Sequence, residues 1–139
     1  MILYLDTSAL VKLYVREGGT EETRTKLDAA SMVATSRVAY PEARAALARR
    51  QREAAITRAA LARAVTALDR DLARFVVVEL SAKVAKRAGE LAERRALRGF
   101  DAIHLASALE VEELTGLVAT FCCFDDRLRE AASAEKLPI

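Results

Sequence analysis

Short apolar runs alternate with helical stretches along the whole chain. Four runs have the length and composition of buried strands, at residues 2–5, 32–35, 76–80 and 118–124, and residues 137–139 form a candidate fifth strand at an edge. Between the runs, apolar residues recur at intervals of three and four, and polar residues such as Thr57 and Ser81 precede them as helix caps. Strands that alternate with helices predict a parallel sheet with helices on both faces.

The longest helical pattern lies in the middle of the chain. One helix is expected from a cap at Ser36 to about residue 53, with Pro41 near its start. The next helix carries one apolar stripe, formed by Leu61, Val65, Leu68, Leu72 and Phe75. These two helices are predicted to form an antiparallel hairpin, and the stripe either packs in the core or docks a partner helix.

Shorter helices are expected on both sides of this hairpin. They cover residues 9–15, 20–30 and 126–132, and the first is capped by one of the polar residues 6–8. Another helix is expected to start at Asp101, after a turn at Gly99 and Phe100. Together with the strands, these helices fill the chain without a linker.

Composition is consistent with one domain over residues 1–139. The apolar fraction of 53% can supply a core, whereas a net charge of +2 is too small to name a partner. No segment reaches transmembrane length and no signal peptide precedes the first strand, so we expect no membrane association and a cytoplasmic location. Cys122 and Cys123 are adjacent, point to opposite faces of a strand, and are predicted to be reduced core thiols.

Four carboxylates stand at the ends of predicted strands or early in predicted helices. Asp6 and Asp125 directly follow apolar strands, Asp101 opens a helix, and Glu42 lies early in the central helix. In an open parallel sheet the carboxyl ends of the strands share one edge, where ligands bind. Each Asp alone is also explained as a helix cap, and Glu42 alone as a solvated residue. Together, acids gathered at one edge repel one another unless a cation lies between them.

The other residues narrow the chemistry to metal-assisted hydrolysis. The single histidine, His104, precludes most catalytic triads, and no Cys/His spacing suits zinc. Neither the GxGxxG nor the GxxxxGK[ST] phosphate loop is present. Carboxylate oxygens are suitable ligands for Mg²⁺ and Mn²⁺. The pattern therefore favours attack of metal-activated water on a phosphodiester.

Four segments resemble, in order, the conserved blocks of the PIN-domain family, and within it the VapC toxins of bacterial toxin–antitoxin pairs. The segments are LDTSAL at residues 5–10, TS at 35–36 with PEARAAL at 41–47, LRGFDAIHLA at 97–106, and FDDRLREAA at 124–132. Any one block is a weak signal, but four in order over this chain length are specific.

The resemblance implies a three-layer α/β/α sandwich with a short parallel sheet, and a Mg²⁺- or Mn²⁺-dependent endoribonuclease. Asp6, Glu42, Asp101 and Asp125 match the acidic quartet of the family. By this match Asp6 and Asp101 are the direct metal ligands, and Asp125 completes the site or acts through water. Glu42 helps to hold the metal or positions the attacking water.

The resemblance also implies partners and further contacts. Thr7 and Ser8 would contact the water shell of the metal or the phosphate. The substrate would be a single-stranded region of tRNA or of another structured RNA, because unpaired loops are where proteins usually recognise RNA. A homodimer and a cognate VapB-like antitoxin, whose tail fills the acidic cleft, are implied as well.

Two features of the fourth block complicate the match. Such toxins often have Thr or Ser two residues before the fourth acid, but here Cys123 stands there and Thr120 lies earlier, which puts a hydroxyl contact from this strand end in doubt. Asp126 is a rival to Asp125. The pattern Phe-Asp-x-x-Leu favours Asp125 and leaves Asp126 as an acid at the start of a helix.

Other polar residues have two explanations each. His104 lies three residues after Asp101, so it contacts RNA, steadies an acid, or is a packed and hydrogen-bonded core residue. A series of arginines either lines an RNA path or belongs to solvated helix faces, namely the residues at 44, 49, 50, 52, 58, 94, 95 and 98.

Two other functions remain open on the sequence alone. A non-catalytic PIN-like module that binds RNA or a partner would keep the fold, although the presence of all four acids argues against it. A phosphoacceptor signalling domain would need an acidic acceptor after the third strand, where the chain instead has Glu79, Leu80 and Ser81.

Overall fold

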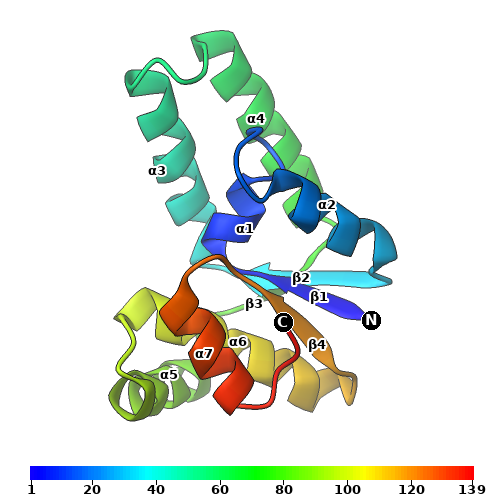
Figure 1. Ribbon diagram of the computed structural model, residues 1–139, viewed down its shortest axis with the longest axis vertical. Coiled ribbons are helices and arrows are strands. Elements are labelled where there is room, and N and C mark those ends of the chain that lie inside the picture. The colour runs from blue at the N-terminus through cyan, green and yellow to red at the C-terminus, as the bar shows by residue number, and fades with distance from the viewer.

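A four-stranded parallel sheet forms the centre of the molecule (Figure 1). The computed structural model describes residues 1–139. The strands are β1 (Ile2–Leu5), β2 (Met32–Ser36), β3 (Val76–Val78) and β4 (Ala119–Cys122), in the spatial order β3-β2-β1-β4. β1 therefore lies between β2 and β4, with Leu5 opposite Cys122. From β1 the chain proceeds to β2 and β3 on one side and then crosses to β4 on the other, so the switch point of the sheet lies at the carboxyl ends of β1 and β4.

Seven helices cover the two faces of this sheet. Those on one face are α1 (Thr7–Val11), α2 (Thr20–Ala29), α3 (Ala39–Arg52) and α4 (Arg58–Leu72), and those on the other are α5 (Ala82–Arg95), α6 (Gly99–Thr115) and α7 (Asp126–Ala134). The predicted three-layer α/β/α sandwich is thus confirmed. In Figure 1, α3 and α4 form the predicted antiparallel hairpin and extend beyond the sheet.

The residues of β1 alternate between two separate cores, as expected for a buried strand. Ile2 and Tyr4 face α5, α6 and α7, where the Tyr4 ring stacks on Phe121 with centroids 5.4 Å apart. Leu3 and Leu5 face α1, α3 and α4. Cys122 joins this second core and Cys123 the first, and both are buried free thiols, which confirms the prediction for the cysteines.

The stripe along α4 belongs to the core. Leu68 is fully buried, and Leu61, Leu72 and Phe75 pack partly buried against the cluster that contains Leu47. Core packing is therefore the explanation for most of the stripe. No helix of the structure is both long and apolar enough to cross a membrane.

Two predicted helix starts were wrong. Ser36 does not cap α3, because it ends β2; its hydroxyl accepts a hydrogen bond from Val38 N, and α3 begins at Ala39. α6 begins at Gly99 rather than at Asp101, so Asp101 is its third residue and not its cap. The helix expected over residues 9–15 is also shorter, because α1 ends at Val11.

The candidate fifth strand is absent. The sheet has four strands, and the C-terminal segment makes one backbone contact with β4, in which Phe121 N donates to Pro138 O over 2.7 Å. Pro138 has no N–H to return a second bond, so a ladder does not continue there.

Gly19 fixes the loop between α1 and α2 against the end of β4. Its φ is +90°, and a Cβ there would lie 2.5 Å from Phe124 Cε1. We predict that Gly19→Ala lowers the free energy of unfolding by roughly 2 kcal/mol, from the left-handed backbone and the clash together. Gly18→Ala is the control, since a Cβ at Gly18 meets nothing within 4 Å; it should change stability by less than about 0.5 kcal/mol. Urea unfolding measures both, and equal effects of the two substitutions would contradict the prediction.

Candidate active site

Asp6 is held at the end of β1, at the switch point of the sheet. Its side chain is buried, with a residue exposure of 5%, and it caps α1. One carboxylate oxygen, Oδ1, accepts hydrogen bonds from Ala9 N at 2.9 Å and from Ser8 Oγ at 2.7 Å. Burial raises the pKa of Asp6, and the charge of Asp101 raises it further, against the opposing effects of His104 and of the two hydrogen bonds. Asp6 is therefore both a helix cap and a carboxylate that is costly to ionise.

A chain of hydrogen bonds joins the core to Glu42. The buried Tyr4 hydroxyl lies 2.9 Å from His104 Nδ1. His104 Nε2 lies 3.1 Å from Glu42 Oε1 and 3.0 Å from Thr7 Oγ1, and Thr7 Oγ1 donates to Glu42 Oε1 over 2.6 Å. When Tyr4 donates to Nδ1, the proton of a neutral ring sits on Nε2, which then donates to Glu42.

This network keeps Glu42 ionised. Burial of Glu42 opposes ionisation, but hydrogen bonds from His104 and Thr7 outweigh it and lower the pKa of Glu42. His104 is 2% exposed. His104 is thus a packed, hydrogen-bonded core residue that also orients an acid. Two of the three explanations given for it on the sequence therefore hold together.

Asp101 and Asp125 approach the same edge from α6 and α7. Asp101 extends from the first turn of α6, and Asp125 caps α7 by accepting a hydrogen bond from Leu128 N at 2.9 Å. Burial and the charge of Asp125 raise the pKa of Asp101, with a smaller rise from Glu42, while His104 and Arg98 lower it. Asp101 therefore interacts electrostatically with all three other members of the quartet.

A polar hollow of about 350 Å³ opens beside Asp101 and Asp125. It is lined only by charged residues: Arg98, Asp101, Asp125, Asp126 and Arg127. Asp126 is the first residue of α7 and borders the hollow, but it is Asp125 whose charge shifts the pKa of Asp101. Arg127 was missed by the sequence analysis, although it stands inside the fourth conserved block.

The quartet supplies oxygen donors without closing into a cage. No three His, Cys, Asp or Glu side chains converge closely enough to hold a metal ion. The reason is that Asp6, Glu42 and Asp125 are each drawn to hydrogen-bond donors of their own, namely the Ser8 hydroxyl with Ala9 N, Thr7 with His104, and Leu128 N. The charges of Asp125 and Glu42 nevertheless raise the pKa of Asp101, and the charge of Asp101 raises that of Asp6, so this donor set suits a hard divalent cation that relieves the repulsion.

Thr7 and Ser8 direct their hydroxyls at these carboxylates, Thr7 to Glu42 and Ser8 to Asp6. They orient acids, and their expected contacts to a water shell or a phosphate remain a prediction. The strand end offers no hydroxyl at position 123, since the Cys123 thiol is buried in the core.

Comparison with known proteins identifies the family. The model of the PIN domain matches residues 3–134. The chain belongs to the PIN-domain family. The resemblance to VapC proteins is confirmed by ribonuclease VapC45 of Mycobacterium tuberculosis, which is 43% identical over 96% of this chain and 90% of its own length.

Solved PIN-domain structures share the fold. Mycobacterium tuberculosis VapC20, a toxin that cleaves the sarcin-ricin loop, superposes with a TM-score of 0.68 at 21% identity, covering 93% of this chain and 94% of VapC20. VapBC2 of Rickettsia felis, solved with a DNA fragment from its promoter, gives a TM-score of 0.56 at 18% identity over 88% of this chain and 100% of that chain. At these identities, the likeness shows a common architecture.

The raised pKa of Asp101 predicts that its ionisation destabilises the fold. A carboxyl group whose pKa is higher in the folded state contributes stability that is complete below its unfolded pKa and is lost as pH rises through the folded pKa. Without divalent cations at neutral pH, Asp101→Asn should therefore raise the free energy of unfolding, by roughly 0.5 kcal/mol because solvent screens a half-exposed carboxylate.

The gain should shrink as pH falls below about 4, where the parent side chain is protonated in both states. Asp126→Asn is the matched control and should give no gain, because a carboxylate at the start of α7 complements the helix dipole. Thermal unfolding across this pH range measures both variants. A loss of stability in Asp101→Asn, or a gain independent of pH, would show that ionisation of Asp101 does not destabilise the fold.

Proposed function

We propose that this protein is a Mg²⁺- or Mn²⁺-dependent endoribonuclease, the toxin of a VapBC-type pair, which hydrolyses single-stranded regions of structured RNA. The observation that carries the proposal is the electrostatic coupling of Asp101 with Asp6, Glu42 and Asp125, which are contributed by different elements around the carboxyl end of the sheet. Carboxylates that are coupled in this way at one edge of a parallel sheet are better explained by a cation and a phosphodiester than by four independent structural roles.

Asp6 and Asp101 are the residues we assign to the metal, with Asp125 as the third. A bound divalent cation lowers the pKa of water and offsets the charge that develops on the phosphate. The three side chains are anchored differently, because Asp6 and Asp125 cap helices whereas Asp101 projects from inside one. Asp101 makes no hydrogen bond within the protein that would compete for its oxygens, so it is the freest of the three to move toward a ligand.

Glu42 is suited to accept the proton of the attacking water. Its pKa is lowered and its carboxylate is oriented by Thr7 and His104, so it stays ionised and in place. Arg98 and Arg127 border the hollow beside Asp101 and can bind the phosphate groups that flank the cleaved bond.

The partners follow from the proposed class. The name of the VapC45 relative supports RNA as the substrate, and the VapBC2 structure supports a VapB-like antitoxin. An unpaired loop of tRNA or of another structured RNA is the substrate we favour. We also propose that the protein is cytoplasmic and forms a homodimer.

Replacing the acids should abolish cleavage. We predict that Asp6→Asn and Asp101→Asn each lower the rate of RNA cleavage by roughly a hundredfold or more, the range seen when a group that stabilises the transition state is lost. The assay is cleavage of bulk tRNA by purified protein with Mn²⁺ or Mg²⁺. Asp28→Asn, an exposed carboxylate of α2, is the control and should leave the rate unchanged. Variants of Asp6 and Asp101 that cut as fast as the parent would refute the proposed function.

Substitutions of Asp125 and Asp126 should have different effects on the rate of RNA cleavage in the same assay. Asn retains the capacity to cap α7, so Asp125→Asn removes charge while it keeps the helix start. We predict a loss of roughly tenfold to a hundredfold for Asp125→Asn, as for residues that support a metal site, and less than about threefold for Asp126→Asn. The reverse order would transfer the fourth acidic role to Asp126.

A further inference from the structure

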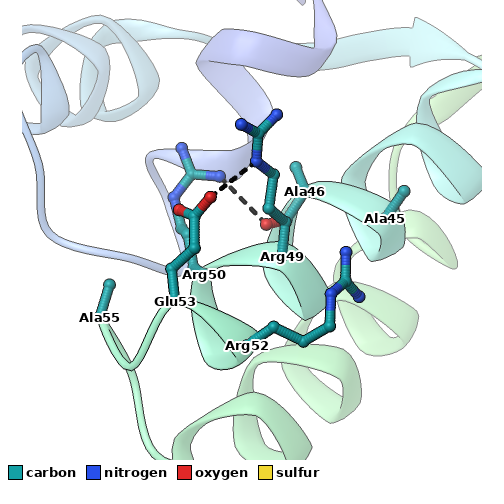
Figure 2. A pocket seen from close by; sticks show the side chains of 7 residues that line it. All are labelled: Ala45, Ala46, Arg49, Arg50, Arg52, Glu53 and Ala55. Atoms are coloured by element: carbon teal, nitrogen blue, oxygen red, sulfur yellow. Dashed lines mark hydrogen bonds and ion pairs between the residues drawn. The ribbon is translucent and has the colours of Figure 1, made fainter.

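A wide hollow lies at the carboxyl end of α3, away from the acidic edge (Figure 2). Its volume is about 710 Å³, and its lining includes Ala45, Ala46, Arg49, Arg50, Arg52 and Glu53. Figure 2 shows the Arg49 guanidinium group directed at the Glu53 carboxylate, with Arg52 extending separately from them. The mechanism at the acidic edge uses none of these residues.

The hollow borders the same face of α3 as Glu42, but farther toward the carboxyl end of the helix. Arg49 stands seven residues after Glu42, which is two helical turns, so the two residues share one side of the helix. At 1.5 Å per residue, Arg49 lies about 10 Å and Arg52 about 15 Å beyond Glu42 along the axis of α3. Ala45 and Ala46 occupy the turn between Glu42 and Arg49, and their small side chains leave space at the helix surface there. On this side of α3, the turn between the acidic edge and the hollow therefore carries short side chains.

The three arginines differ in how tightly the protein holds them. Arg50 is fixed, because its guanidinium donates to Glu17 Oε2 at 2.8 Å and to Ala46 O at 3.2 Å. Arg49 donates to Glu53 at 2.9 Å in an exposed pair, and Arg52 has no ion-pair partner. Exposed pairs contribute little free energy, so a phosphate can replace Glu53 at Arg49 at small cost.

We propose that this hollow is a phosphate-binding subsite for the RNA strand that runs from the acidic edge along α3. Arg49 and Arg52 bind backbone phosphates beyond the cleaved bond, where guanidinium groups match phosphate geometry. Arg50 forms the fixed wall of the subsite, and Glu53 competes with RNA for Arg49. The inference rests on the proposed function, since it takes RNA as the ligand of the acidic edge.

Binding to fluorescein-labelled polyuridine tests the subsite, in an Asp101→Asn background that prevents cleavage. Replacing both Arg49 and Arg52 by Gln should weaken binding by roughly tenfold at low salt and reduce the slope of log affinity against log salt by about 1.4, or 0.7 for each lost phosphate contact. The control replaces Arg63 and Arg74 by Gln. Both are exposed, lie outside the hollow and have no ion-pair partner, so this control removes the same charge and should change neither quantity.

A substitution that should tighten RNA binding, rather than weaken it, provides a second test. Glu53→Gln frees Arg49 and removes a negative charge from the hollow, so it should tighten binding of polyuridine by roughly threefold. Glu90→Gln, an exposed glutamate of α5 without an ion-pair partner, is the matched control and should have no such effect.

Equal effects of the two arginine pairs on the salt slope would overturn the subsite, as would a failure of the Asp101→Asn protein to bind polyuridine at all. So would an unchanged affinity in Glu53→Gln; the hollow would then have to serve another ligand, such as an acidic protein segment. The proposed function fails on a different result, namely cleavage of RNA by Asp101→Asn at the rate of the parent.

Discussion

Repulsion among carboxylates at the ends of β1 and β4 is the constraint around which this molecule is built. Asp6 and Asp125 cap helices. Each accepts a hydrogen bond from a backbone N–H of its helix, and this bond offsets part of the free-energy cost of the negative charge. Asp101 has no such offset, and burial together with Asp125 raises its pKa. Arg98 and His104 offset only part of this rise, so negative charge at this edge of the sheet is incompletely compensated, which favours binding of a cation there.

The core determines how one of these acids is oriented. Tyr4 lies in the middle of β1, stacked on Phe121, and reaches His104, which in turn contacts Glu42 and Thr7. Side chains from β1, α1, α3 and α6 are therefore locked together by one set of hydrogen bonds. A polar network of this kind is stable in a core only when every member has a partner, so the same bonds that position Glu42 also make His104 tolerable as a buried residue.

Local patterns predicted the parts of this arrangement that local physics determines. The first strand at Ile2–Leu5, the second apart from its last residue Ser36, the caps at Thr57 and Ser81, and the helix hairpin were all visible as apolar periodicity and capping residues. The start of α6 was not, because Gly99 and Phe100 carry no cap signal and Arg98 makes no side-chain cap. The contacts between Tyr4 and His104 and between Thr7 and Glu42 join residues 100 and 35 positions apart, so no local pattern contains them. The quartet was predicted by the order of the family blocks, and its catalytic role stays a proposal.

The central claim is that the crowded acids form a single cation site at the switch point of the sheet. The most direct measurement is an anomalous difference map from crystals of the protein soaked in Mn²⁺. The account predicts a Mn²⁺ ion coordinated by the carboxylates of Asp6 and Asp101, and no ion there in crystals of Asp101→Asn. A map in which Mn²⁺ avoids both side chains, or binds equally well without Asp101, would contradict it.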